Sequence, residues 1–320
     1  MERIGVLTSG GDSPGMNAAI RAAVRGGLYH GMEIFGVERG YEGLISGEIY
    51  RMDRRSVSDI IQRGGTILKT ARSEAFMEDE GFSMALNMLD SFQIDGLIVI
   101  GGNGSLTGAL KLADAGIKVI GLPGTIDNDL PFTDYTIGFD TAVNTVLGAV
   151  GNIRDTSHSH DRITIIEVMG RECGDIAIYA GLTGGAEIIL IPEREADIQS
   201  ICRRLVEGKN NGKRSSIIIK AEGVNMSTEE LERSIRERTG LDAKMVILGY
   251  IQRGGSPTAR DRMLASRLGY EAVDLLRSGA YNKAVGVRGG KTVSYDLSEA
   301  MRMKKTSVAD LDVLADILSR

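Results

Sequence analysis

Two patterns of apolar residues alternate along this chain. Short apolar runs predict buried strands, whereas apolar residues that recur every three or four positions predict amphipathic helices. The predicted strands cover residues 4–7, 33–37, 96–100, 117–120, 163–168, 188–191, 216–220 and 245–251, with a strand pair around 287–292. The predicted helices cover residues 16–29, 56–62, 82–89, 106–113, 141–155, 174–181, 197–207, 228–238 and 259–277, with a turn at 40–43 and a helical tail from Val308. This alternation predicts an α/β fold with doubly wound parallel sheets.

The composition is that of a globular protein with more than one lobe. A chain of 320 residues is long for a single core, and 42% of its residues are hydrophobic. The net charge of -5 argues against a general nucleic-acid or membrane role. Cys173 and Cys202 lack metal-binding spacing, and so few thiols are typical of a reducing compartment. No signal peptide or bilayer-spanning run is evident, so we expect a cytoplasmic location.

Glycine-rich loops follow two of the predicted strands and precede predicted helices. They are residues 8–15 (TSGGDSPG) and 101–105 (GGNGS). Because backbone N–H groups at a helix N-terminus favour anions, the pair indicates a nucleotide-phosphate site. Neither loop is a G-x-G-x-x-G or Walker A sequence, and a plain strand–helix turn is the alternative for each one alone. Arg72, after Gly64 and Gly65, is a candidate phosphate clamp or an ordinary surface residue.

A third loop, residues 121–129 (GLPGTIDND), follows the predicted strand 117–120 and combines a hydroxyl with carboxylates. Ligands of open α/β sheets bind at such strand ends. Asp127 and Asp129 point to similar sides if the backbone is extended, and neighbouring carboxylates push each other's pKa values apart. That suits one of them to act as a general base. An Asx-rich turn is the alternative interpretation.

Taken together, five segments resemble the bacterial 6-phosphofructokinases, in the same order and over nearly the whole chain. They are residues 7–12, 101–105, 123–129, 169–171 and 249–255. The resemblance implies a glycolytic kinase that transfers the γ-phosphoryl group of ATP, with Mg²⁺, to the 1-hydroxyl of fructose 6-phosphate. It also implies a homotetramer of subunits with two Rossmann-like lobes. The expected ATP-binding lobe is residues 1–138 plus about 252–302, and the expected sugar-phosphate and effector lobe is residues 139–251 plus about 303–320.

The resemblance further implies roles for individual residues. Asp127 would accept the hydroxyl proton, Thr125 would help to hold the transferring group, and Asp129 would orient the site or reach the metal indirectly. Arg72 and Arg171 would stabilise charge on the transferred phosphoryl group. The other ATP positions are Gly11, Ser73, Gly102, Asn103, Gly104, Ser105 and Gly108. The other sugar-phosphate positions are Met169, Gly170, Glu222, Lys244, Tyr250, Arg253 and, reaching in from a neighbouring subunit, Arg162. Among these, Glu222 would accept sugar hydroxyls, and Arg253 and Arg162 would hold the 6-phosphate.

Gly104 and Gly124 bear on the phosphoryl donor. Relatives that use pyrophosphate resemble this chain but carry Asp and Lys at these two positions, which block the adenosine-phosphate position. Two glycines leave room for ATP, so we expect ATP as the donor.

The resemblance also implies an allosteric site for ADP or phosphoenolpyruvate. Converging arginines suit an anionic effector. The matching positions are Arg21, Arg25, Arg54, Arg154, Gly185, Glu187, Lys213 and Arg214. Asn211 and Ser215 stand where the family often has basic residues, so this chain's effector response is an open question.

Three positions depart from the family pattern. Asn103 replaces an Asp that ligates Mg²⁺, and its amide oxygen is neutral, so Mg²⁺ would depend more on the ATP phosphates. Lys244 replaces an Arg and loses the bidentate fork, and Tyr250 replaces a His near the same sugar phosphate. The alternatives are tolerated drift, an altered paralogue that acts on another phosphosugar, or a non-catalytic nucleotide- or sugar-phosphate-binding regulatory subunit.

Overall fold

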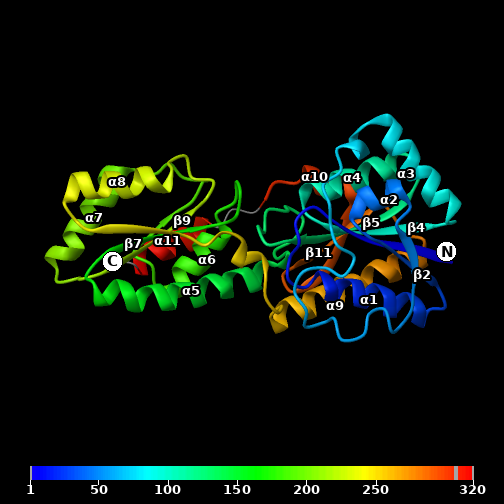
Figure 1. Cartoon of the computed structure of the whole chain (residues 1–320), viewed down its shortest axis with the longest axis horizontal. Coiled ribbons are helices and arrows are strands. Elements are labelled where there is room, and N and C mark those ends of the chain that lie inside the picture. The colour runs from blue at the N-terminus through cyan, green and yellow to red at the C-terminus, as the bar shows by residue number, and fades with distance from the viewer. Residues whose placement is uncertain (1, 306–308, 319–320) are drawn as a thin grey trace. The chain divides into compact units, whose positions relative to one another are not determined.

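The computed structural model describes residues 2–305 and 309–318, which divide into two compact units, each with its own sheet (Figure 1). The first unit comprises the described residues up to Ile126, Leu130–Thr141 and Arg253–Lys305. The second comprises Asp127–Asp129, Ala142–Gln252 and the described residues after Lys305. No sequence pattern predicted that Asp127–Asp129 would group with the second unit.

An eight-stranded, mostly parallel sheet forms the centre of the first unit. Its order is β12-β11-β5-β4-β1-β2-β3, with β6 paired to β5, and only β2–β3 and β11–β12 are antiparallel. Its strands are β1 (Arg3–Ser9), β2 (Glu33–Val37), β3 (Ile49–Met52), β4 (Gly96–Gly101), β5 (Lys118–Thr125), β6 (Ile137–Gly138), β11 (Lys283–Arg288) and β12 (Lys291–Asp296). The central strand β4 is buried at every position, as expected for a strand covered on both faces.

Helices cover both faces of this sheet (Figure 1). One face packs against α1 (Met16–Tyr29) and α9 (Ala259–Ser278). The other packs against α2 (Gly40–Ser46), α3 (Asp79–Ser91), α4 (Asn103–Asp114) and α10 (Leu297–Arg302), with the short 3₁₀ helix η1 (Ala75–Met77). Gly269 lets α9 approach α1, because a Cβ there would lie 2.6 Å from the carbonyl oxygen of Ala19.

The second unit contains a four-stranded parallel sheet of order β10-β7-β9-β8. Its strands are β7 (Ile163–Val168), β8 (Ile188–Leu190), β9 (Ser216–Ala221) and β10 (Ala243–Ile247). Its helices are α5 (Phe139–Ser159), which begins in the first unit, α6 (Asp175–Gly184), α7 (Ile198–Asn210), α8 (Thr228–Thr239) and α11 (Ala309–Leu318). The 3₁₀ helix η2 (Gly249–Arg253) leads back to the first unit. The predicted α/β class with doubly wound sheets is confirmed.

Two local predictions between β2 and α3 are wrong. The predicted turn at residues 40–43 is the start of helix α2, because Tyr41, Leu44 and Ile45 follow a helical spacing and bury one face. The predicted helix at 56–62 is a series of turns. Its apolar residues do enter the core, but Asp59 is left-handed (φ 51°), which interrupts a helix.

Other boundaries also differ from the predictions. The strand predicted over 245–251 ends at Ile247, because Gly249 turns left-handed (φ 54°) into η2. The strand predicted over 117–120 continues to Thr125, because its parallel ladder with β4 extends as far as Pro123. β3 and α10 were not predicted, and Val308 lies outside the described residues. Across residues 2–305 and 309–318, every helix is too short or too polar to cross a bilayer.

Asp261, in the first turn of α9, ties together three elements of the first unit. It is 1% exposed and accepts hydrogen bonds from the backbone N–H groups of Gly138 (3.0 Å) and Thr141 (2.8 Å) and from the Thr141 hydroxyl (2.5 Å). Burial raises the pKa of this carboxyl group, and the hydrogen bonds oppose that shift. The contact holds β6 and the first turn of α5 against α9.

Asp261→Ala should destabilise the protein, because two buried N–H groups and a hydroxyl lose this acceptor. We expect the free energy of unfolding to fall by about 2–4 kcal/mol in urea denaturation. Asp274→Ala is the control, since it removes a carboxylate of the same helix that forms only an exposed pair with Arg277, and it should leave the unfolding midpoint nearly unchanged. Equal losses in the two variants would contradict the assignment.

Candidate functional site

Three chain segments of the first unit meet at the carboxyl edge of its sheet. β1, β4 and β5 are neighbours, with Ser9 opposite Gly101 and Gly101 opposite Pro123. The loop after β1, the loop after β4 and the end of β5 at Thr125 therefore emerge side by side. This is the edge at which open parallel sheets bind ligands.

Close contacts require glycine at position 101 in the loop after β4. A Cβ at Gly101 would lie 2.5 Å from the Ser105 hydroxyl oxygen and 2.6 Å from the Ser9 carbonyl oxygen. A Cβ at Gly102 would lie 3.5 Å from the Cβ of Thr125. Ser105 and Thr125, two of the predicted site residues, thus lie against the same short glycine segment. The Thr136 hydroxyl donates to the Thr125 carbonyl at 2.6 Å and holds the end of β5.

Two helices of the first unit begin at this edge with glycine N-caps. α1 follows Gly15 and α4 follows Gly102. Glycine has no side chain that could cap the first turn, and neither of these described first turns contains an acidic residue. Their N-terminal N–H groups and helix dipoles are suited to phosphate. Asn103 and Gly104 are exposed in the first turn of α4, and a Cβ at Gly104 meets no atom within 4 Å.

The segment that carries Arg72 and Ser73 runs beside the first glycine loop. The Thr70 hydroxyl donates to the Gly10 carbonyl at 2.7 Å, and Arg72 itself is exposed. The Ser73 hydroxyl accepts the backbone N–H of Phe76 at 3.2 Å, so it stabilises η1. Arg253 also reaches this loop, because a Cβ at Gly11 would lie 3.5 Å from its guanidinium.

Gly108, on α4, makes room for an aromatic ring that the sequence analysis did not select. A Cβ at this position would lie 2.6 Å from the ring of Tyr41. The Tyr41 hydroxyl donates to the Ser105 carbonyl at 2.5 Å, and its ring stacks on Phe76 with centroids 4.1 Å apart. Burial raises the pKa of Tyr41 far above its usual value, so it acts only as a neutral donor. Tyr41 therefore stabilises the segment from Ser105 to Gly108 through this hydrogen bond and through its ring contact.

The candidate general base lies in the second unit and is paired with a cation. Asp127 is 5% exposed, and its Oδ2 lies 3.3 Å from Nε of the exposed Arg171. Asp129, two residues later, is half-buried. Asn128 between them is left-handed (φ 54°), so the extended backbone assumed for the two carboxylates is not present. A buried carboxylate beside a solvent-facing guanidinium can both accept a proton and face a transferring phosphoryl group.

The loop after β7 carries three predicted sugar-phosphate residues and is held by two side chains. Glu222 Oε1 accepts the backbone N–H groups of Gly170 (3.2 Å) and Arg171 (2.9 Å). Gln252 accepts the Met169 N–H at 3.1 Å and donates to the Gly249 carbonyl at 3.0 Å. Glu222 was predicted to face sugar hydroxyls, and in this unit it also caps the loop. Gln252 was not predicted, although a polar residue in an apolar, glycine-flanked stretch is a usable signal.

Three further sugar-phosphate positions lie elsewhere on the second unit. Arg162, before β7, pairs with Asp242 through Nε at 3.2 Å. Lys244 is exposed on β10, and Tyr250 in η2 is 79% exposed. Arg162 is half-buried, whereas the side chains of Lys244 and Tyr250 are exposed on this unit.

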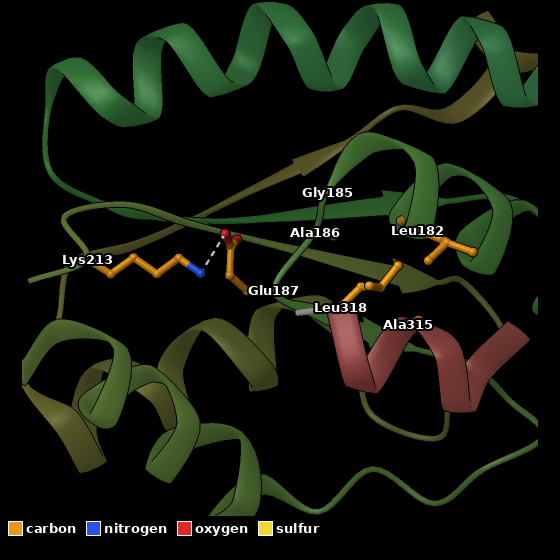
Figure 2. A pocket seen from close by; sticks show the side chains of 8 residues that line it. Leu182, Gly185, Ala186, Glu187, Lys213, Ala315 and Leu318 are labelled. Atoms are coloured by element: carbon orange, nitrogen blue, oxygen red, sulfur yellow. Dashed lines mark ion pairs between the residues drawn. The ribbon is translucent and has the colours of Figure 1, made fainter. Parts of the chain in front are cut away.

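The predicted effector residues fall on both units. Arg21 and Arg25 lie on α1, and Arg54 lies after β3, in the first unit. In the second unit, Arg154 donates to the carbonyls of Gly184 (2.6 Å) and Gly185 (2.9 Å). Figure 2 shows the Lys213–Glu187 ion pair (3.1 Å) beside a cavity of about 140 Å³, closed on one side by α11. Arg214 lines a separate cavity of about 530 Å³.

These observations define an α/β protein with a glycine-rich sheet edge suited to phosphate and a carboxylate–arginine pair. The sequence profile of the phosphofructokinase family matches residues 3–276, and the chain belongs to this family. The resemblance inferred from the sequence is therefore confirmed.

Similar proteins cover the full chain. Proteins named ATP-dependent 6-phosphofructokinase from Clostridium botulinum and Clostridium acetobutylicum are each 55% identical over 320 residues, which is 100% of both chains. The structure of phosphofructokinase from Saccharomyces cerevisiae matches with a TM-score of 0.90 at 36% identity, and this chain spans 48% of its length. A pyrophosphate-dependent phosphofructokinase from Marinobacter aquaeolei matches at TM-score 0.84 over 97% of this chain and 86% of that one; at 23% identity it shows the fold alone.

Gly108→Ala should weaken the nucleotide loop, because the added methyl group displaces Tyr41 and its hydrogen bond to Ser105. We expect a loss of about 1–3 kcal/mol of unfolding free energy and weaker ATP binding by calorimetry. The control is Gly148→Ala on α5, where an added Cβ meets no atom within 4 Å and Ala favours the helix. Unchanged ATP affinity in Gly108→Ala would count against a role for Tyr41 beneath the loop.

Proposed function

We propose that this chain transfers the γ-phosphoryl group of ATP to the 1-hydroxyl of fructose 6-phosphate, with Asp127 as the general base. The overall reaction is that of an ATP-dependent 6-phosphofructokinase, an enzyme of glycolysis, as named for relatives 55% identical over their full length. The observation that supports the assignment of the base is the buried Asp127 carboxylate, 3.3 Å from Arg171.

In the proposed mechanism, the 1-hydroxyl oxygen attacks the γ-phosphorus. The bond from that phosphorus to the bridging oxygen breaks, ADP leaves, and the hydroxyl proton passes to Asp127. Arg171 orients the Asp127 carboxylate and stabilises charge on the transferring group, as Arg72 does from the first unit. Thr125 helps to hold the transferring group, and Asp129 orients the site.

The first unit supplies the ATP contacts in this proposal. The N-termini of α1 and α4 bind phosphate oxygens, and Gly104 leaves the space that ATP requires. Asn103 is exposed beside these N–H groups and offers one neutral oxygen ligand, so the ATP phosphates supply most of the coordination of Mg²⁺. When bound, Mg²⁺ neutralises phosphate charge during transfer.

The second unit supplies sugar-phosphate contacts. Glu222 and the Met169–Arg171 loop bind the sugar, and Arg253, which belongs to the first unit, binds its 6-phosphate. Lys244 and Tyr250 contribute at the same phosphate, and Arg162 reaches the site of a neighbouring subunit. We infer a cytoplasmic homotetramer with an effector site formed by the eight predicted residues. Lys244 and Tyr250, which replace an Arg and a His of the family pattern, favour one second candidate, a kinase for a different phosphosugar. Relative rates across phosphosugars would decide between the two.

Asp127→Ala should lower kcat by about 10²- to 10⁴-fold, because the hydroxyl loses its proton acceptor. KM for ATP should change little, since the nucleotide contacts lie in the first unit. The measurement is an aldolase-coupled assay with Mg²⁺, ATP and fructose 6-phosphate. Asp155→Ala, an exposed carboxylate on α5, is the control and should retain full activity. Tight ligand binding by the unmodified chain without turnover would instead indicate a regulatory binding protein.

Lys244→Arg should strengthen fructose 6-phosphate binding, because guanidinium binds phosphate through two parallel hydrogen bonds. We expect KM for this sugar to fall by up to about tenfold with kcat nearly unchanged. Lys209→Arg, an exposed lysine of α7, serves as the control. A KM that stays the same, or one that falls for another phosphosugar instead, would argue against this role of Lys244.

A further inference from the structure

The loop that carries the candidate base is fixed by its middle residue. Asn128 is 3% exposed and left-handed (φ 54°), a conformation that Asn tolerates better than most residues. Its side-chain Nδ2 donates to Asp175 Oδ2 at 2.7 Å, a buried contact within the second unit. Its carbonyl oxygen accepts from the Cys173 thiol at 4.0 Å. Asp175 and Cys173, which lie two residues apart, therefore both bond Asn128, the residue next to Asp127.

The segment of Cys173 and Asp175 also carries the cation that pairs with Asp127. The Cys173 N–H donates to the Gly170 carbonyl at 2.9 Å and closes a turn that contains Arg171. Asp175 follows this turn by two residues. The Glu193 carboxylate accepts the Gly174 N–H at 2.9 Å and holds the turn from the other side. Cys173, Asp175 and Glu193 place ligand-type atoms within 4.8 Å of one another, but each of the three makes a hydrogen bond that holds this loop.

We propose that the Asn128–Asp175 hydrogen bond is the positioning contact that aims the Asp127 carboxylate at the reacting hydroxyl. Asn128 and Asp175 are positioning residues and touch no substrate. The inference rests on the proposed role of Asp127. Its physical basis is that Arg171 holds one side of the base, whereas the backbone direction of the base is set at residue 128. Without the anchor, the loop samples other left- and right-handed conformations and the base is aligned for only part of the time.

Variants of the full-length protein test this contact. Asn128→Gly keeps the left-handed backbone accessible but removes the amide, and Asp175→Ala removes the acceptor. Each should lower kcat with ATP and fructose 6-phosphate by about 10- to 100-fold, as expected for a misplaced catalytic group. KM for ATP should stay within about threefold. Asp175→Asn keeps an oxygen that accepts from Asn128, and should retain kcat within about threefold.

A double variant and a matched control separate positioning from general stability. Asn128→Gly combined with Asp175→Ala should be no slower than the slower single variant, because both changes remove one contact. Asn282 is also left-handed (φ 57°), and its side chain accepts the Val119 N–H at 3.1 Å. Asn282→Gly should therefore lower the melting temperature yet keep kcat within about twofold.

The proposal is overturned if Asn128→Gly retains kcat within about twofold, or if the losses multiply in the double variant. If Asp127→Ala abolishes turnover while Asn128→Gly does not, positioning fails and the proposed function stands. If Asp127→Ala itself retains turnover, the assignment of the base fails first.

Discussion

The parallel register of β1, β4 and β5 is the constraint on which the nucleotide side of this protein depends. Parallel pairing places Ser9 opposite Gly101 and Gly101 opposite Pro123, so β1 and β4 end at one level and β5 ends two residues beyond it, at Thr125. Every loop that follows must then turn within the space of neighbouring strands. Only glycine fits at Gly101, where a Cβ would lie 2.5 Å from the Ser105 hydroxyl oxygen. The glycine at position 101 thus follows from the packing of the sheet edge.

In the second unit, a side chain rather than a glycine contact fixes the loop at a strand end. The loop after β7 passes through two positive-φ residues, Gly170 and Arg171, whose N–H groups cannot join a regular ladder. Glu222 accepts both N–H groups. One carboxylate therefore fixes the loop at two consecutive positions. It also means that a change at Glu222 would alter the direction of Arg171.

The resemblance to phosphofructokinases identified the family and assigned roles to residues, but it did not say which residues contact one another. The comparisons confirm the family, the fold and the overall reaction. The geometry adds residues that no family motif selected. Tyr41 supports the Ser105 carbonyl, Gln252 joins Met169 to η2, and Asp175 anchors Asn128. Each is buried and polar, and each makes at least one hydrogen bond to a residue far away in sequence.

The sequence by itself determined the strand–helix alternation, the phosphate loops and the position of Asp127, because these follow from local periodicity and from glycine chemistry. It misjudged residues 40–43, 56–62 and 248–251, where left-handed residues or core contacts decide the local structure. Only the tertiary structure decided that Asn128 bends the catalytic loop and that Glu222 caps another. Those facts depend on partners 47 and about 50 residues away in the chain, which no local pattern encodes.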